Sequence, residues 1–127
     1  MINEAELDVR SFSFNDLRGL DRWESWGPSY SFATATNLTV SGRFKVVGRM
    51  CFWQVKSTGT SLATTAGTSY IVLPIPAVGY AGIGTMTNDT TNIAVGVGHI
   101  DVATSRFYPP TQGASGNDFT FAGSYEV

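Results

Sequence analysis

The stretch RFKVVGRMCFWQVK, residues 43–56, decides the fold, because it is the longest run of strand-forming apolar residues in the chain. Neighbouring strand residues point to opposite faces of a sheet, so a strand over this run is apolar on both faces. One face can enter a sandwich core, and the other needs a second cover. Symmetry mates in an oligomer are one source of such a cover. The row Val47, Cys51, Trp53 and Val55 is then the candidate interface between copies, with the choice between the two rows of the strand left open. If the second face instead meets another sheet of the same chain, this reason for an oligomer falls away.

The composition predicts an all-β protein of one domain. Gly, Ser and Thr make up about a third of the 127 residues, whereas Leu, Lys, Glu and Gln are scarce. Thr, Val, Tyr and Phe suit strands, and glycine marks turns and bulges. Alternating segments recur at short spacing, so we predict an antiparallel β-sandwich or jelly-roll-like fold of about seven or eight strands. A chain of this length buries enough surface to fold without disulfides or metals.

Three segments downstream show further strand patterns. Residues 70–73 are apolar and lead into Pro74 and Pro76, which cannot donate to a ladder and confine that segment to an edge or a rim. Residues 93–98 alternate branched apolar side chains with alanine or glycine, and a glycine face lets another backbone approach closely. Residues 119–127 also alternate, and Gly123 continues their aromatic row, which predicts a bulge or a tight contact.

Residues 1–22 differ from the rest of the chain in their high content of charged residues. We predict that they form an extended N-terminal arm ahead of a β-sandwich domain at residues 23–127. Residues 1–26 hold six acidic residues and three arginines, while the remainder is nearly neutral. Asn15 is a candidate cap for a short helical turn that Gly19 ends. Large apolar side chains have little reason to occur on a free tail. We therefore expect the arm to lie on its own domain or on a neighbour through Phe12, Phe14, Leu17 and Leu20.

Two tryptophans, Trp23 and Trp26, stand where the arm meets the domain. We expect them to anchor the arm and to cover one end of the sandwich core. Trp26 has an equal claim to be an ordinary core residue. Trp23 is the better candidate for an interface, since aromatic anchors dominate such surfaces.

Charge and hydropathy argue against several partners. The formal net charge is −2 and the basic residues are scattered, so the chain lacks the basic patch that nucleic acid requires. The apolar runs are too short to cross a membrane. The first residues lack the basic and apolar regions of a signal peptide, so we expect synthesis in a cytoplasm. Cys51 is the single cysteine, and we expect it to be a small buried hydrophobe.

No arrangement of residues in the sequence predicts an enzyme, a metal site or a cofactor. His99 is the single histidine, and no second imidazole or thiol lies near it in the sequence. No nucleophile-elbow motif accompanies the serines. A carbohydrate-processing enzyme would need two paired acids, which would have to come from Asp89, Asp101, Asp118 and Glu126. Three of these acids fall in or beside predicted turns, where aspartate is ordinary.

Four segments occur in an order that resembles small β-sandwich modules of bacteriophage virion proteins. They are WESWGPSYSF (23–32), GRFKVVGRMCFWQVKSTGTS (42–61), YIVLPIPA (70–77) and FTFAGSYEV (119–127). The matching positions are Trp23, Trp26, Pro28, Arg43, Phe44, Gly48, Phe52, Leu73, Pro74, Gly123 and Tyr125. The resemblance covers about residues 22–127. It implies a non-enzymatic structural role, usually as a trimer, on tail-fibre tips or as a decoration (cement) protein on capsids.

The resemblance and the arm together favour a capsid decoration protein over a tail fibre, since 127 residues leave no room for a long shaft. We expect a homotrimer on the virion surface that binds and reinforces the shell of the major capsid protein, with the apolar arm residues and Trp23 in contact with the capsid. The alternative is a tail-fibre tip that binds a host-surface glycan, with stacking platforms at Tyr80, Phe107 and Tyr108. Ordinary packing at the rim of the fold is the competing interpretation of these aromatic residues.

Overall fold

The computed structural model describes residues 22–79 and 82–127, and within them the chain is all-β, as the composition predicts. All of the strand pairs are antiparallel. The strands are β1 (Glu24–Trp26), β2 (Tyr30–Ser31), β3 (Thr34–Thr36), β4 (Thr39–Val47), β5 (Met50–Thr58), β6 (Ser61–Thr64), β7 (Tyr70–Val72), β8 (Ile83–Asn88), β9 (Ile93–Asp101), β10 (Arg106–Tyr108), β11 (Gln112–Ser115) and β12 (Phe119–Glu126). The predicted count of seven or eight strands is too low, because strands of two to four residues are too short to show alternation.

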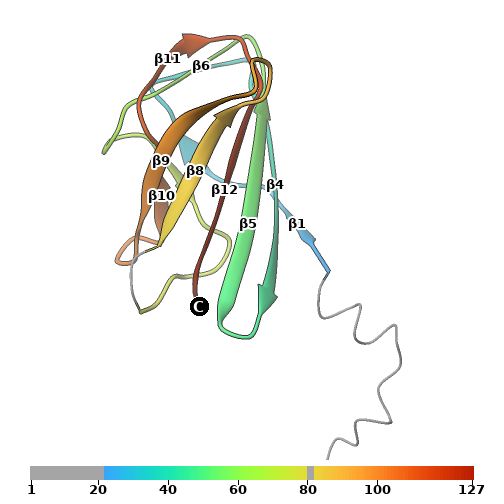
Figure 1. Cartoon of the computed structure of the whole chain (residues 1–127), viewed down its shortest axis with the longest axis vertical. Coiled ribbons are helices and arrows are strands. Elements are labelled where there is room, and N and C mark those ends of the chain that lie inside the picture. Colours follow the sequence, from blue (N-terminus) through green and yellow to red (C-terminus); the bar gives the residue numbers. More distant parts are fainter. Residues whose placement is uncertain (1–21, 80–81) are drawn as a thin grey trace, which may run out of the picture.

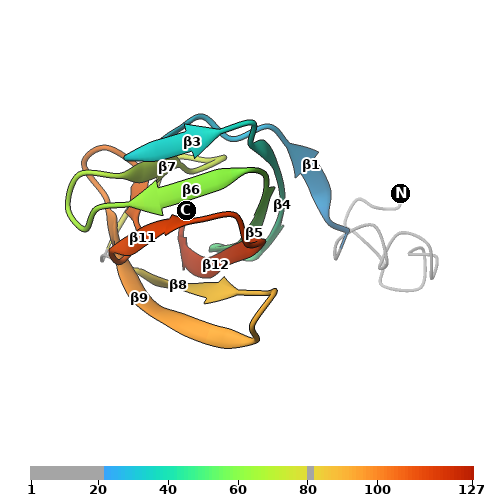
Figure 2. The ribbon, with the colours of Figure 1, turned by 90° about the horizontal axis from the view of Figure 1, so that it is seen from above.

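The strands form one large curled sheet and one small sheet. The large sheet has nine strands in the order β1-β4-β5-β12-β8-β9-β10-β7-β2, and the small sheet has the order β11-β6-β3. Seen from above, the large sheet curls around the interior of the domain, and the small sheet lies across the opening of this curl (Figure 2). Strands β6 and β11 lie at one end of the long strands, so the small sheet covers that end of the core (Figure 1).

The run at residues 43–56 is a hairpin, and the prediction of a single long strand is wrong. Strands β4 and β5 pair from Thr39 opposite Thr58 to Val47 opposite Met50. The two residues between them, Gly48 and Arg49, make the turn, and Gly48 has a φ of 62°. A positive φ at the first central position alone matches a type II′ hairpin turn, which favours glycine there.

The hairpin also corrects the predicted trimer interface. Cys51, Trp53 and Val55 are at most 1% exposed and lie in the core of one chain. Val47, across the turn, lies on the opposite face and is 49% exposed. Other strands of the same chain therefore cover the apolar row of β5, and its three side chains are not available to a second copy.

A row of glycines lets two aromatic rings lie across the inner face of the large sheet. Gly123 of β12 pairs with both Trp53 and Gly84, and Gly84 pairs with Gly98. The rings of Trp53 and Phe107 lie over this row with centroids 5.0 Å apart. A Cβ atom on Gly84 would come within 2.8 Å of the Phe107 ring and 3.1 Å of the Trp53 ring. The glycines therefore provide the space that the rings fill. Close contact at Gly123 is confirmed, and no register shift interrupts β12.

Tyr125 ties β12 to the segment that follows β7. Its hydroxyl donates a hydrogen bond to the Ile75 carbonyl at 2.8 Å and accepts one from the Ile75 N–H at 3.2 Å. The side chain is 2% exposed. Burial raises the pKa of the Tyr125 hydroxyl well above its ordinary value, and a contact with the Cys51 thiol adds to the rise.

This raised pKa predicts alkaline destabilisation. The folded state keeps the Tyr125 proton, whereas the unfolded chain loses it above about pH 10. This contribution to stability is therefore complete below that pH and is lost progressively as the pH rises above it. Above pH 10 we expect the free energy of unfolding to fall by about 1.4 kcal/mol per pH unit from this residue. Tyr125→Phe should cost about 1 kcal/mol at neutral pH and remove that component of the slope. Urea unfolding of both proteins between pH 8 and pH 11 measures the difference, and identical slopes would contradict the assignment.

Candidate functional site

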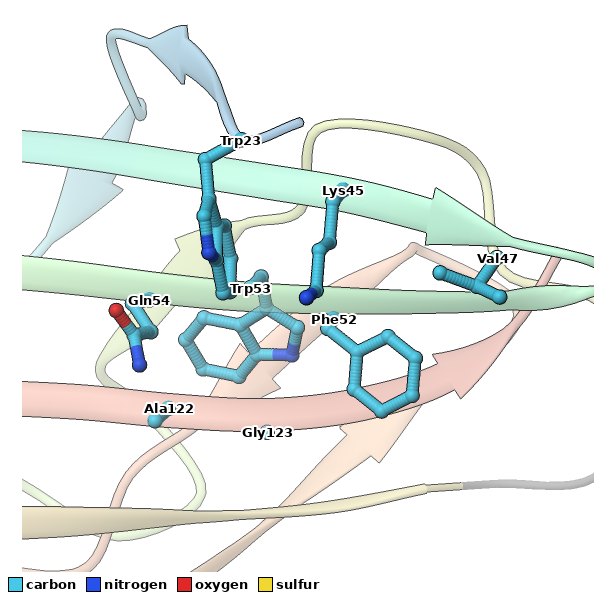
Figure 3. Close-up of a pocket in the computed structure, with 8 residues that line it drawn as sticks. All are labelled: Trp23, Lys45, Val47, Phe52, Trp53, Gln54, Ala122 and Gly123. Atoms are coloured by element: carbon cyan, nitrogen blue, oxygen red, sulfur yellow. The ribbon is translucent and has the colours of Figure 1, made fainter. Parts of the chain in front are cut away.

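The outer face of the β4–β5 hairpin and β12 carries an open groove. Its volume is about 490 Å³. Residues from four parts of the chain line it: Trp23, Lys45, Val47, Phe52, Trp53, Gln54, Ala122 and Gly123 (Figure 3). We call this feature the outer groove. Its size falls within the usual range of ligand pockets, about 300–1,000 Å³.

Strand alternation explains how these residues come together. Odd-numbered residues of β4 and even-numbered residues of β5 face outward, and Lys45 pairs directly with Phe52. On the neighbouring strand β12 the groove meets only Ala122 and Gly123, whose small size leaves a hollow beside the larger side chains. Trp53 also borders the groove, but its side chain is 1% exposed and belongs to the core.

Trp23 forms one wall of the outer groove, held by two basic side chains. The Arg43 guanidinium lies 4.6 Å and the Lys45 ammonium 5.0 Å from the centre of the Trp23 ring. Both distances suit cation–π interactions. Arg43 is fixed in turn, because its Nε donates a 2.8 Å hydrogen bond to Gln54 Oε1. The Trp23 and Lys45 side chains both extend toward β5 (Figure 3).

The same outer face exposes several large apolar side chains. We define the outer apolar patch as Val47, Met50, Phe52, Ile83 and Val97, which are between 37% and 65% exposed. The patch extends across the sheet from β4 and β5 to β8 and β9, with β12 between the two pairs of strands. Apolar residues gathered on one face in this way are typical of an interaction surface.

A second group on the outer face is aromatic, and we call it the aromatic cluster. The rings of His99 and Tyr108 are stacked, with centroids 5.4 Å apart, and the Tyr70 ring lies 6.2 Å from that of Tyr108. The Arg106 guanidinium lies 3.8 Å from the centre of the Tyr70 ring. The cluster spans β7, β9 and β10, beyond the Val97 side of the outer apolar patch.

The structure separates the predicted glycan-binding residues. Tyr108 lies in the aromatic cluster on the outer face. Phe107 is fully buried against Trp53 and Phe121, so its predicted role as a stacking platform is wrong; neighbouring strand residues face opposite ways. Tyr80 lies outside the described residues.

The predicted arm residues are only partly within the described chain. Phe12, Phe14, Leu17 and Leu20 lie outside it, whereas Trp23 is half-buried in the outer groove. Trp26 packs edge-on against Phe44 at the margin of the core, with ring centroids 6.3 Å apart. Of the two tryptophans, Trp26 therefore serves the core and Trp23 borders the groove.

Two aspartates among the described residues accept hydrogen bonds from nearby threonines. Asp89 accepts hydrogen bonds from the hydroxyls of Thr87 and Thr120, and Asp101 accepts one from Thr104. Burial raises the pKa of the Cys51 thiol, which disfavours the reactive thiolate. In residues 22–79 and 82–127, no group of three or more His, Cys, Asp or Glu side chains is placed to hold a metal ion. The same residues contain no helix long and apolar enough to span a membrane.

Sequence reasoning missed the outer groove because it missed the turn. With residues 43–56 taken as one strand, Lys45, Phe52 and Gln54 do not face one another. The signal was present in Gly48, which separates two valines from Arg49 and the next apolar run. A glycine at that position permits the two-residue turn that brings Lys45 opposite Phe52.

Comparisons with known proteins assign no family to this chain. No family model matches it. No curated protein and no solved structure matches it either.

Proposed function

We propose that this protein is a bacteriophage virion structural protein, a trimeric capsid decoration protein that binds the outer surface of the major capsid protein shell and reinforces it. The observation that carries the proposal is the outer apolar patch. Five large apolar side chains share one face of a single sheet with a groove that ends in Trp23. Exposed apolar side chains that share one face favour protein partners, and aromatic residues are common anchors at such contacts.

We assign the two contacts that this function needs to different parts of the outer face. Ile83 and Val97 are 65% and 61% exposed and lie on β8 and β9, away from the outer groove. We assign the contact between copies to this side, in place of the buried row of β5. Trp23 and the residues before it are then left for the capsid.

Light scattering after size-exclusion chromatography tests the trimer. The full chain should elute with about three chain masses, because a symmetric contact covers the exposed residues of each copy. Replacing both Ile83 and Val97 by Glu should give a folded monomer, since burying unpaired charge costs several kcal/mol. Thr60→Glu, an exposed position at the other end of the sheet, is the control and should remain trimeric. A monomeric full chain would contradict the proposal.

A binding assay tests the capsid contact. Capsids of the same phage that lack the protein should bind it in a fixed copy number and then resist heating better. Trp23→Ala should reduce the bound amount at least about tenfold, the effect expected when an anchor worth more than 1.4 kcal/mol is lost. Binding that is unchanged in Trp23→Ala would remove this residue from the contact, and no binding by the unaltered chain would refute the decoration role.

The aromatic cluster favours a second candidate, a tail-fibre tip that recognises a host-surface glycan. Tyr108, His99 and Tyr70 offer ring faces near a cation, Arg106, an arrangement suited to stacking on a sugar and bonding its hydroxyls. On this hypothesis Tyr108→Ala abolishes binding to host-surface polysaccharide in calorimetry, and Phe52→Ala, on the opposite side of the outer face, does not. If the unaltered chain gives no heat of binding with the polysaccharide, the glycan hypothesis is rejected and the decoration role is the remaining candidate.

A further inference from the structure

The chain enters the described fold at the wall of the outer groove. Trp23 lines the groove and contacts Arg43 and Lys45, and only Arg22 separates it from residues 1–21. Three residues of extended chain span at most about 11 Å, so Leu20 cannot be farther than that from Trp23 of its own chain. The segment before Trp23 is therefore held next to the groove by covalent connection alone.

The charges of the hairpin and of this segment are complementary. Residues 39–58, which form the β4–β5 hairpin, contain four basic and no acidic residues. Residues 1–21 contain five acidic residues and two arginines. On the outer face, Lys45 borders the outer groove. Arg43 and Lys56 border a second hollow of about 390 Å³, and Gln54 borders both. A basic track thus runs beside the apolar groove.

The apolar residues are complementary as well. The outer groove presents Phe52 and Val47, which are 37% and 49% exposed. Leu17 and Leu20 are the two large apolar residues nearest to Trp23 in the segment that precedes it. A segment with two leucines between Asp16 and Asp21 matches a groove with an apolar floor and basic borders.

We propose that residues 15–21 bind the outer groove of their own chain, with Leu17 and Leu20 against Phe52 and Val47. Asp16 and Asp21 then lie beside the basic side chains that border the groove. Connection through Asp21 and Arg22 places the segment at high effective concentration, so weak contacts are sufficient for binding within one chain. Phe12 and Phe14 stay available to a partner, and the inference holds for the free protein whether or not it is a decoration protein.

Nuclear magnetic resonance on the full chain tests this directly. A spin label is attached to Ser13→Cys, since the native Cys51 is fully buried. The label should broaden the amide signals of Lys45, Phe52 and Ala122. In a variant that also carries Leu17→Asp and Leu20→Asp, the broadening at these three residues should be lost. The matched control carries Phe12→Asp and Phe14→Asp, which add the same charge to the same segment, and should keep the broadening.

Mixed samples show which chain supplies the segment. Spin-labelled chain without ¹⁵N is combined with ¹⁵N chain without a label, after subunit exchange where the protein is oligomeric. Binding within one chain predicts no broadening of the outer groove signals in this mixture. Broadening across chains would overturn the proposal in favour of docking on a second copy. Equal broadening with and without the two Leu→Asp changes would show that the segment is only tethered nearby and would overturn it as well.

Discussion

Replacing Trp53 by alanine should lower the free energy of unfolding by about 3–5 kcal/mol, the cost of removing a large buried aromatic side chain. Trp53 is 1% exposed, packs at a tilt against Phe107 and lies across Gly84 and Gly123. The surrounding β-strands are held by their ladder hydrogen bonds and can close the resulting cavity only in part. Urea unfolding followed by circular dichroism measures the change.

The control for this prediction is Phe52→Ala, one position away on the opposite face of β5. Phe52 is 37% exposed, so its removal should cost only about 1–2 kcal/mol, clearly less than the removal of Trp53. Comparing the two variants also tests whether the row Cys51, Trp53 and Val55 belongs to the core or to an interface between copies. If Trp53→Ala stayed as stable as the unaltered chain but became monomeric, the buried row would be an interface after all.

Replacing Gly84 by valine should cost about 3 kcal/mol, at the upper end of the effects of overpacking. A Cβ atom at this position would lie 2.8 Å from the Phe107 ring and 2.9 Å from the Ala122 carbonyl oxygen. Neither neighbour can move freely, since Phe107 is fully buried and Ala122 belongs to the central strand β12. Thermal unfolding of the variant should show a clearly lower Tm.

Gly113→Val is the matched control, because no atom lies within 4 Å of a Cβ built on Gly113. This change on β11 should alter the free energy of unfolding by no more than about 0.5 kcal/mol. A Gly84→Val protein as stable as Gly113→Val would mean that the two rings do not depend on the glycine row for their space.

The sequence predicted the fold class because composition and alternation report on the inner and outer faces of strands. The alternation of residues 119–127 and the close contact at Gly123 are both seen in β12. Whether an apolar run of fourteen residues is one strand or two depends on the backbone of a single glycine. The local pattern tolerates both, and only pairing with β12 and β1 makes the hairpin the better packed solution.

The candidate site was less predictable, because it joins residues far apart in the chain. Trp23 was selected as an interface residue by its type and place, and it does border the outer groove. Lys45 and Phe52 carry no such signal, since their role follows from pairing across the turn. Phe107 and Tyr108 show the limit of reasoning from residue type: adjacent aromatic residues on β10 point to opposite sides of the sheet.

The position of β12 has a consequence for the order in which the protein folds on the ribosome. Strand β12, at Phe119–Glu126, lies between β5 and β8 and pairs with both. The β4–β5 and β8–β9 hairpins have local partners and can form as soon as each is synthesised. Neither can join the other until residues 119–126 have left the exit tunnel. The β4–β5 hairpin would therefore expose its apolar inner face from its emergence until β12 follows late in synthesis, which makes slow and late assembly the expected course.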